Sequence, residues 1–172
     1  MKILCDSMNV KIRYALANDL KEIVEIYNQA IKTRTSIAYT KELTVENRKE
    51  WFYEHTKDNY PILVAEKNNM ILGWISLSPY RKGRDALKKT VEVSYFVHND
   101  HKRKGIGSKL LNEILKKGKA LGYKTIFAVI FDKNLGSAKL LEKNNFEKWG
   151  FLPEVAEIDG NLLSHIYYGI KL

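Results

Sequence analysis

The residues best suited to chemistry form one short stretch, KRKGIGS at positions 102–108, which runs directly into an amphipathic segment. Glycines at 105 and 107 let the oxygens of a ligand approach the backbone closely. A helix N-terminus adds unpaired N–H groups and a partial positive charge, and the three preceding cations can add charge-assisted hydrogen bonds. This combination predicts a binding site for a pyrophosphate group at the start of a helix.

Three known phosphate loops resemble this stretch. The dinucleotide fingerprint GxGxxG needs a third glycine where Leu110 stands. A Walker loop needs Gly-Lys followed by Ser or Thr, whereas the order here is Gly107, Ser108, Lys109. The third pattern, [Q/R]xxGxG before an amphipathic helix, differs from this sequence only at Lys102. On the motif alone, a glycine-rich helix start without a ligand stays an alternative.

A carboxylate and a basic loop are further candidates. Glu92 lies in the β-rich segment TVEVSYFVH at 90–98, and apolar surroundings could raise its pKa toward that of a general base. The alternative is an outward-facing position of an amphipathic strand. Arg81 could form a bidentate pair with an amino-acid carboxylate or a phosphinate. It lies in a run of five cations, however, and such runs are commonly solvated surface.

The N-terminal half must position these residues with strands and helices of its own. Alternation predicts a strand over 9–15, and apolar spacing predicts a helix that begins with a capping box of Asp19 and Glu22. Thr44 is expected to cap a second helix. Asn68 and Asn69, between two apolar runs, predict a β-hairpin because asparagine tolerates positive φ.

The C-terminal half is expected to alternate between strands and helices. We predict a strand over 90–98, a helix from 105 to about 121, a strand over 124–131, a short helix over 134–144 and one or two closing strands that include 165–172. The resulting order is β, α, α, β, β, β, α, β, α, β, β. This is a mixed α/β layer protein with a single domain over 1–172, in which 1–8 form a short extension.

Composition narrows the class of protein. The 172 residues carry a net charge of +9, four histidines and one cysteine, Cys5. A single cysteine excludes an internal disulfide and indicates a reducing, cytoplasmic setting, and the scattered histidines give no spacing typical of a metal site. No apolar run is long enough to predict a membrane span. The positive charge alone would suit nucleic acid, an anionic membrane surface or a polyanionic small ligand.

Read together, the segments resemble the GCN5-related N-acetyltransferase superfamily and, more narrowly, the phosphinothricin / methionine sulfone (sulfoximine) acetyltransferase family. The resemblance covers about residues 10–172. It is carried, in order, by YNQAI at 27–31, the segment 33–38, Trp51 with Phe52, YPILVAE from Tyr60, GWISLSPYR from Gly73, TVEVSYFV from Thr90, the KRKGIGS loop and Asn134. It implies a twisted mixed sheet with helices on both faces, splayed between its fourth and fifth strands, with acetyl-CoA in the gap. It also favours a homodimer, with neither nucleic acid nor membrane as partner.

The resemblance implies roles for particular residues. Glu92 would be the catalytic base beside the substrate amine, and no metal is implied. The coenzyme would be bound by Tyr95, Phe96, Val97, Arg103, Lys104, Gly105, Ile106, Gly107, Ser108 and Asn134. The substrate would be contacted by Arg81, Lys82, Gly83, Glu92, Val93 and Ser94. A plain helix cap is the alternative role of Asn134.

Two departures from the family pattern bear on mechanism. Leu141 stands where many members of the superfamily have a tyrosine that protonates the departing thiolate, so the general acid is not identified. Lys102 stands where the loop usually has Gln or Arg. Lysine keeps the positive charge of arginine but lacks its planar guanidinium group.

The function implied is acetyl-CoA-dependent N-acetylation of the primary amine of a small amino-acid-like substrate. The alternatives are acetylation of a protein N-terminus or a polyamine, a basic nucleic-acid-binding module, and a coenzyme-binding domain without activity.

Overall fold

Strands and helices follow one another in the predicted order in the computed structural model, which describes residues 9–172. Cys5 and the predicted extension 1–8 lie outside the described residues. The strands are β1 (Lys11–Tyr14), β2 (Ile62–Lys67), β3 (Met70–Pro79), β4 (Thr90–Val97), β5 (Thr125–Phe131), β6 (Glu147–Ile158) and β7 (Asn161–Lys171). The helices are α1 (Leu20–Lys32), α2 (Val45–Glu54), α3 (Ile106–Ala120) and α4 (Leu135–Lys143), with three short 3-10 turns between elements.

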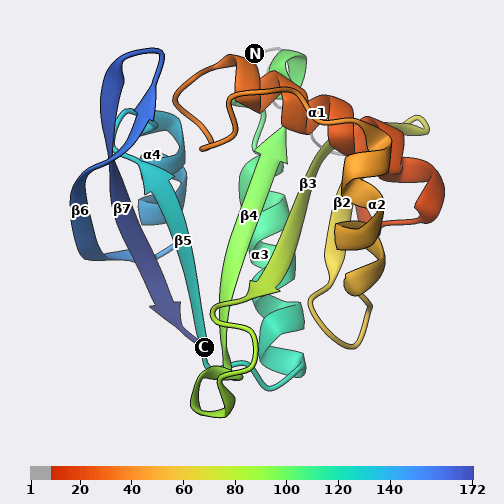
Figure 1. Ribbon diagram of the computed structural model, residues 1–172. Coiled ribbons are helices and arrows are strands. Elements are labelled where there is room, and N and C mark those ends of the chain that lie inside the picture. The colour runs from red at the N-terminus through yellow and green to blue at the C-terminus, as the bar shows by residue number, and fades with distance from the viewer. Residues whose placement is uncertain (1–8) are drawn as a thin grey trace, which may run out of the picture.

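The described strands form one mixed sheet in the order β1-β2-β3-β4-β5-β7-β6 (Figure 1). Neighbouring strands are antiparallel except for β4 and β5, which run parallel. Helices α1 and α2 cover one face, where Trp74 is buried among their side chains. Helix α3 covers the other face with fully buried Leu110, Leu111 and Ile114. The predicted mixed α/β fold with helices on both faces is therefore confirmed.

Two local predictions from the sequence, the β2–β3 hairpin and the Thr44 helix cap, are confirmed. Asn68 and Asn69 join β2 to β3 with φ of 51° and 60°, the left-handed pair that a two-residue hairpin of the observed twist requires. Thr44 Oγ1 accepts the backbone N–H of Asn47, whose side chain accepts the N–H of Thr44 in return. Both turns are fixed by local residues, which explains why sequence alone located them.

The predicted capping box at the start of α1 is wrong. The buried Asp19 carboxylate accepts the N–H of Leu16 and a bidentate pair of bonds from Arg13 at 2.6 and 3.0 Å. Glu22 instead accepts the backbone N–H of Ile71 on β3. The ion pair of Asp19 with Arg13 on β1 takes the place of the helix cap. A buried carboxylate is stabilised more by a guanidinium than by the N–H groups of its own helix.

No helix among residues 9–172 is both long and apolar enough to cross a membrane.

Candidate active site

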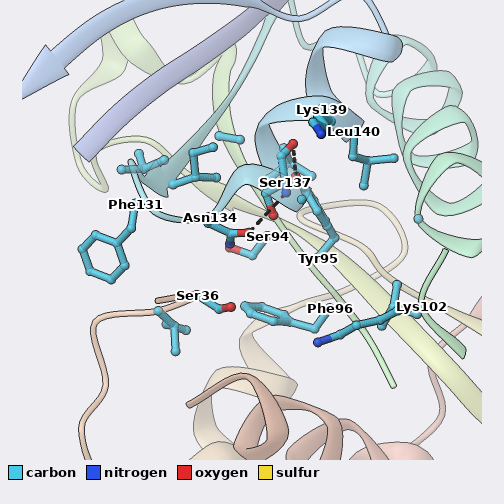
Figure 2. Close-up of a pocket in the computed structure, with 18 of the residues that line it drawn as sticks. Ser36, Ser94, Tyr95, Phe96, Lys102, Phe131, Asn134, Ser137, Lys139 and Leu140 are labelled. Atoms are coloured by element: carbon cyan, nitrogen blue, oxygen red, sulfur yellow. Dashed lines mark hydrogen bonds between the residues drawn. The ribbon is translucent and has the colours of Figure 1, made fainter. Parts of the chain in front are cut away.

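A cavity of about 860 Å³ opens where β4 and β5 part and reaches the N-termini of α3 and α4. Strands β4 and β5 are paired only over 90–92 and 125–127, and Figure 1 shows them diverging beyond that point. Most of the side chains labelled in Figure 2 come from β4, the loop before α3 and the first turns of α4. The predicted splay between the fourth and fifth strands is thus confirmed, and residues of both strands line the cavity.

The backbone of β4 turns its free polar groups toward this gap. The N–H of His98 donates to the carbonyl of Leu72 on β3. In an antiparallel pair these bonds alternate along the strand, so the N–H and C=O groups of Tyr95 and Val97 point away from β3. Strand β5 has already diverged there, and an extended ligand rich in amides can pair with these groups as an added strand.

The start of α3 presents unpaired N–H groups to the same cavity. Gly105 precedes the helix in the left-handed region, with φ of 81°, and no side chain caps this end. The first bond of the helix runs from the N–H of Lys109 to the carbonyl of Gly105. The N–H groups of Ile106, Gly107 and Ser108 consequently have no partner within the helix, and all three residues line the cavity. Such an end binds anionic oxygens.

The cations of this loop diverge in direction. Lys102 and Arg103 are exposed and line the cavity, where they can meet a phosphate. Lys104 lines instead a smaller hollow of about 210 Å³ beside Val10 and Met70. The structure therefore brings two of the three predicted cations to the site and turns the side chain of the third elsewhere.

Asn134 has both of the roles considered for it. Its Oδ1 accepts the N–H of Ser137 at 3.2 Å, which makes it the cap of α4, and it also lines the cavity (Figure 2). The capping bond uses only the amide oxygen, so the amide NH₂ can still donate to a ligand. Leu141, at the position where a tyrosine acid is common, is fully buried in the core.

Glu92 is the carboxylate of the cavity. It lies on the face of β4 that α1 and α2 cover, and burial raises its pKa. The structure shows no hydrogen bond or ion pair of its side chain with any residue of 9–172, so nothing holds it in the charged form. A half-buried carboxylate with a raised pKa is suited to accept a proton.

The substrate residues predicted from the sequence divide into two groups. Val93 and Ser94 line the cavity beside Glu92. Arg81, Lys82 and Gly83 are exposed and do not line it; Lys82 pairs with Glu54 at 2.9 Å, and the Arg81 guanidinium lies over its neighbour Tyr80. The structure thus does not bring this loop to the cavity.

Sequence reasoning missed a second wall of the cavity. It comes from β5, β7 and α4, and its polar members are Ser137, Lys139, Lys143, His165 and Tyr167. His165 and Tyr167 alternate along one strand, which indicates a shared face. Only the pairing of β7 with β5, which sets His165 opposite Phe131, directs that face at the site. No group of three or more His, Cys, Asp or Glu side chains suited to a metal occurs in the described part of the chain.

Comparison with known proteins agrees with this geometry. The profile of the acetyltransferase (GNAT) family matches residues 21–146. The chain is 42% identical to the candidate phosphinothricin acetyltransferase YwnH of Bacillus subtilis, over 87% of this chain and 91% of that protein. It is 30% identical to the L-methionine sulfoximine/L-methionine sulfone acetyltransferase of Salmonella typhimurium, over 94% of each chain.

A solved structure of similar fold contains acetyl-CoA. The phosphinothricin acetyltransferase of Sinorhizobium meliloti, crystallised with acetyl-CoA, superposes with a TM-score of 0.90 at 27% identity, over 96% of this chain and 89% of that chain. With the parted strands, the uncapped helix start and these relatives together, the chain belongs to the acetyltransferase (GNAT) family.

Proposed function

We propose that this protein transfers the acetyl group of acetyl-CoA to the primary amine of a small amino-acid-like substrate of the phosphinothricin, methionine sulfoximine or methionine sulfone type. The observation that carries the proposal is one cavity that joins the free backbone of β4, the uncapped start of α3 and the carboxylate of Glu92. The names of the relatives support the choice of coenzyme and substrate class.

The residues present fit acetyl-CoA, which when bound would supply the activated acetyl thioester. The N–H groups of Ile106, Gly107 and Ser108 would hold its pyrophosphate, with Lys102 and Arg103 beside them. Tyr95 and Val97 would pair with its amide-bearing arm through backbone groups that have no strand neighbour. The amide NH₂ of Asn134 would donate to the same arm.

We infer that Glu92 acts as the base. An amino group is mostly protonated at neutral pH, and only its free form attacks a thioester, so the chain must remove a proton near the cavity. Burial raises the pKa of Glu92 toward neutrality, and it shares the cavity with Tyr27 and Tyr39. These rings would border a small amine bound at the carboxylate.

A homodimer is the assembly that we propose. Strand β6 is the last strand of the described sheet and exposes Trp149, Phe151, Leu152 and Val155. An exposed edge with this much apolar surface favours association. Sedimentation velocity of the unaltered protein and of Phe151→Glu should give a dimer and a monomer, respectively. A monomeric unaltered protein would exclude the proposal.

The experiment that tests the function is a thiol-release assay with acetyl-CoA. The amines are phosphinothricin, methionine sulfoximine, methionine sulfone, a polyamine and a peptide with a free N-terminus. Turnover with the three amino-acid analogues supports the proposal. Preference for the peptide or the polyamine would show that the proposed substrate class is wrong. If none of the amines were acetylated, the proposed activity would be refuted.

A further inference from the structure

His55 and Ser78 lie close to Glu92 in the fold, and neither has a role in the mechanism proposed so far. His55 follows the last residue of α2, and its Nε2 is 3.3 Å from Ser78 Oγ on β3. Ser78 is paired directly with Glu92 on β4. Neither His55 nor Ser78 is among the residues that line the cavity.

Ser78 and Glu92 share one face of the sheet. Directly opposed residues of an antiparallel pair project to the same face, with Cβ atoms about 4.5–5.5 Å apart. The contact between Ser78 and His55 fixes that face as the one covered by α2. A glutamate carboxyl and a serine hydroxyl at this spacing can meet directly after a side-chain rotation, or through one water molecule.

The backbone of α2 decides the direction of the hydrogen bond between His55 and Ser78. Nδ1 of His55 lies 2.6 Å from the carbonyl oxygen of Trp51. A carbonyl oxygen only accepts, so Nδ1 carries the hydrogen and, in the neutral ring, Nε2 is the acceptor. Ser78 must then donate to Nε2, which leaves its oxygen lone pairs as acceptors for a proton on Glu92.

This order matters because a base must lose its proton before the next turnover. With coenzyme and amine bound, the cavity side of Glu92 is filled. The geometry points to a proton relay in which protonated Glu92 donates to Ser78, Ser78 donates to Nε2 of His55, and His55 releases the proton to water. The O–H bond of Glu92 breaks as that of Ser78 forms, and the original Ser78 O–H breaks as an N–H forms on His55. This inference rests on the proposed role of Glu92.

The groups around His55 suit a side chain that accepts a proton and releases it again. Burial lowers its pKa, and the positive charge of Arg48 lowers it further, whereas hydrogen bonds with the backbone of Trp51 on α2 and of Leu77 on β3, together with the charge of Glu54, oppose the shift. On β3 it faces the Ser78 hydroxyl, and Glu92 on β4 lies beyond that serine. An imidazolium held below its ordinary pKa gives up its proton readily, so the relay resets to the neutral tautomer.

The test compares Ser78→Ala and His55→Phe with two controls. Ser78→Thr keeps the hydroxyl, and Ser76→Ala removes a buried hydroxyl two residues away on the same face, one that makes no hydrogen bond among the described residues. We expect kcat of Ser78→Ala to fall about tenfold with the KM of the amine within about twofold. Rising concentrations of a small buffer base should restore it, which a merely structural defect would not allow.

The outcomes separate this inference from the proposed function. An unaltered protein without turnover refutes the function. Normal turnover in Ser78→Ala, or a lowered kcat that no buffer base restores, overturns the relay and leaves the function intact. Combining Ser78→Ala with Glu92→Gln should cost no more than Glu92→Gln alone.

Nitrogen-15 spectra of the histidines test the hydrogen-bond direction without turnover. The relay requires hydrogen on Nδ1 of His55 near neutral pH, and a tautomer with hydrogen on Nε2 would overturn it.

Discussion

Replacing Glu92 by glutamine removes the proposed base and leaves the cavity nearly unchanged. Glutamine has the same shape and cannot accept the ammonium proton. Because the wild-type carboxylate has no bond to any described residue, the change should break no contact and cost little stability. General-base catalysis contributes about 10²–10⁴ in rate, so kcat should fall by that factor, or by about 2.7–5.5 kcal/mol of barrier.

The pH dependence of kcat/KM gives a second measure of the same change. A base works only when deprotonated, and burial raises the pKa of Glu92. Activity of the unaltered enzyme should therefore fall as pH drops through a value above about 4.3, the ordinary pKa of glutamate. In Glu92→Gln this limb should vanish, and any limb that belongs to the amine itself should stay.

The assay is release of free thiol from acetyl-CoA with the best amine of the panel. Glu25→Gln, a change at an exposed glutamate of α1, is the matched control. Coenzyme affinity, measured by calorimetry, should be the same in all three proteins, since neither Glu92 nor Glu25 is among the groups proposed to bind the coenzyme. If Glu92→Gln kept more than about a third of kcat, or the same acid limb, Glu92 would not be the base.

Three further changes test the site and the fold. Gly105→Ala should destabilise the protein by about 1–2 kcal/mol in chemical denaturation, because φ is 81° while the space around a Cβ there is open; unchanged stability would contradict the strained geometry. Removing both Lys102 and Arg103 by alanine should raise the KM of acetyl-CoA at low salt and flatten its salt dependence, without changing the KM of the amine. An unchanged salt profile would exclude both cations from phosphate binding. Asp19→Asn should lower the free energy of unfolding by about 1–3 kcal/mol near neutral pH. Burial would raise the pKa of Asp19, but bonds from Arg13 and Leu16 outweigh it and hold the pKa below its ordinary value. The stabilisation is present above the unfolded pKa and is lost as pH falls through the folded one, so the two proteins should converge in acid; a constant difference would refute the assignment.

Residue types alone predicted several local backbone conformations. The asparagine pair before β3, the Thr44 cap and Gly105 before α3 each adopt the backbone that their residue types favour. Hydrophobic periodicity and capping residues placed the helices and the strands up to β5 in order, because each side of the sheet must bury one apolar face, whereas the C-terminal pair was left as one or two closing strands. The family resemblance added the splay of the sheet and the position of Glu92.

Tertiary structure decided which side chains meet. The capping box of Asp19 and Glu22 was lost to the guanidinium of Arg13 on β1 and to the backbone of Ile71 on β3, contacts that the helical spacing of Asp19 and Glu22 does not indicate. Arg81 to Gly83 follow β3 closely along the chain yet remain in solvent, whereas His165 and Tyr167, far along the chain, reach the cavity through the pairing of β7 with β5. The sequence by itself thus determined the elements and the uncapped start of α3, which we propose binds the pyrophosphate and whose N–H groups lie on contiguous backbone. The walls of the cavity and the contacts behind Glu92 depend on strand pairing over long separations, which only the folded sheet sets.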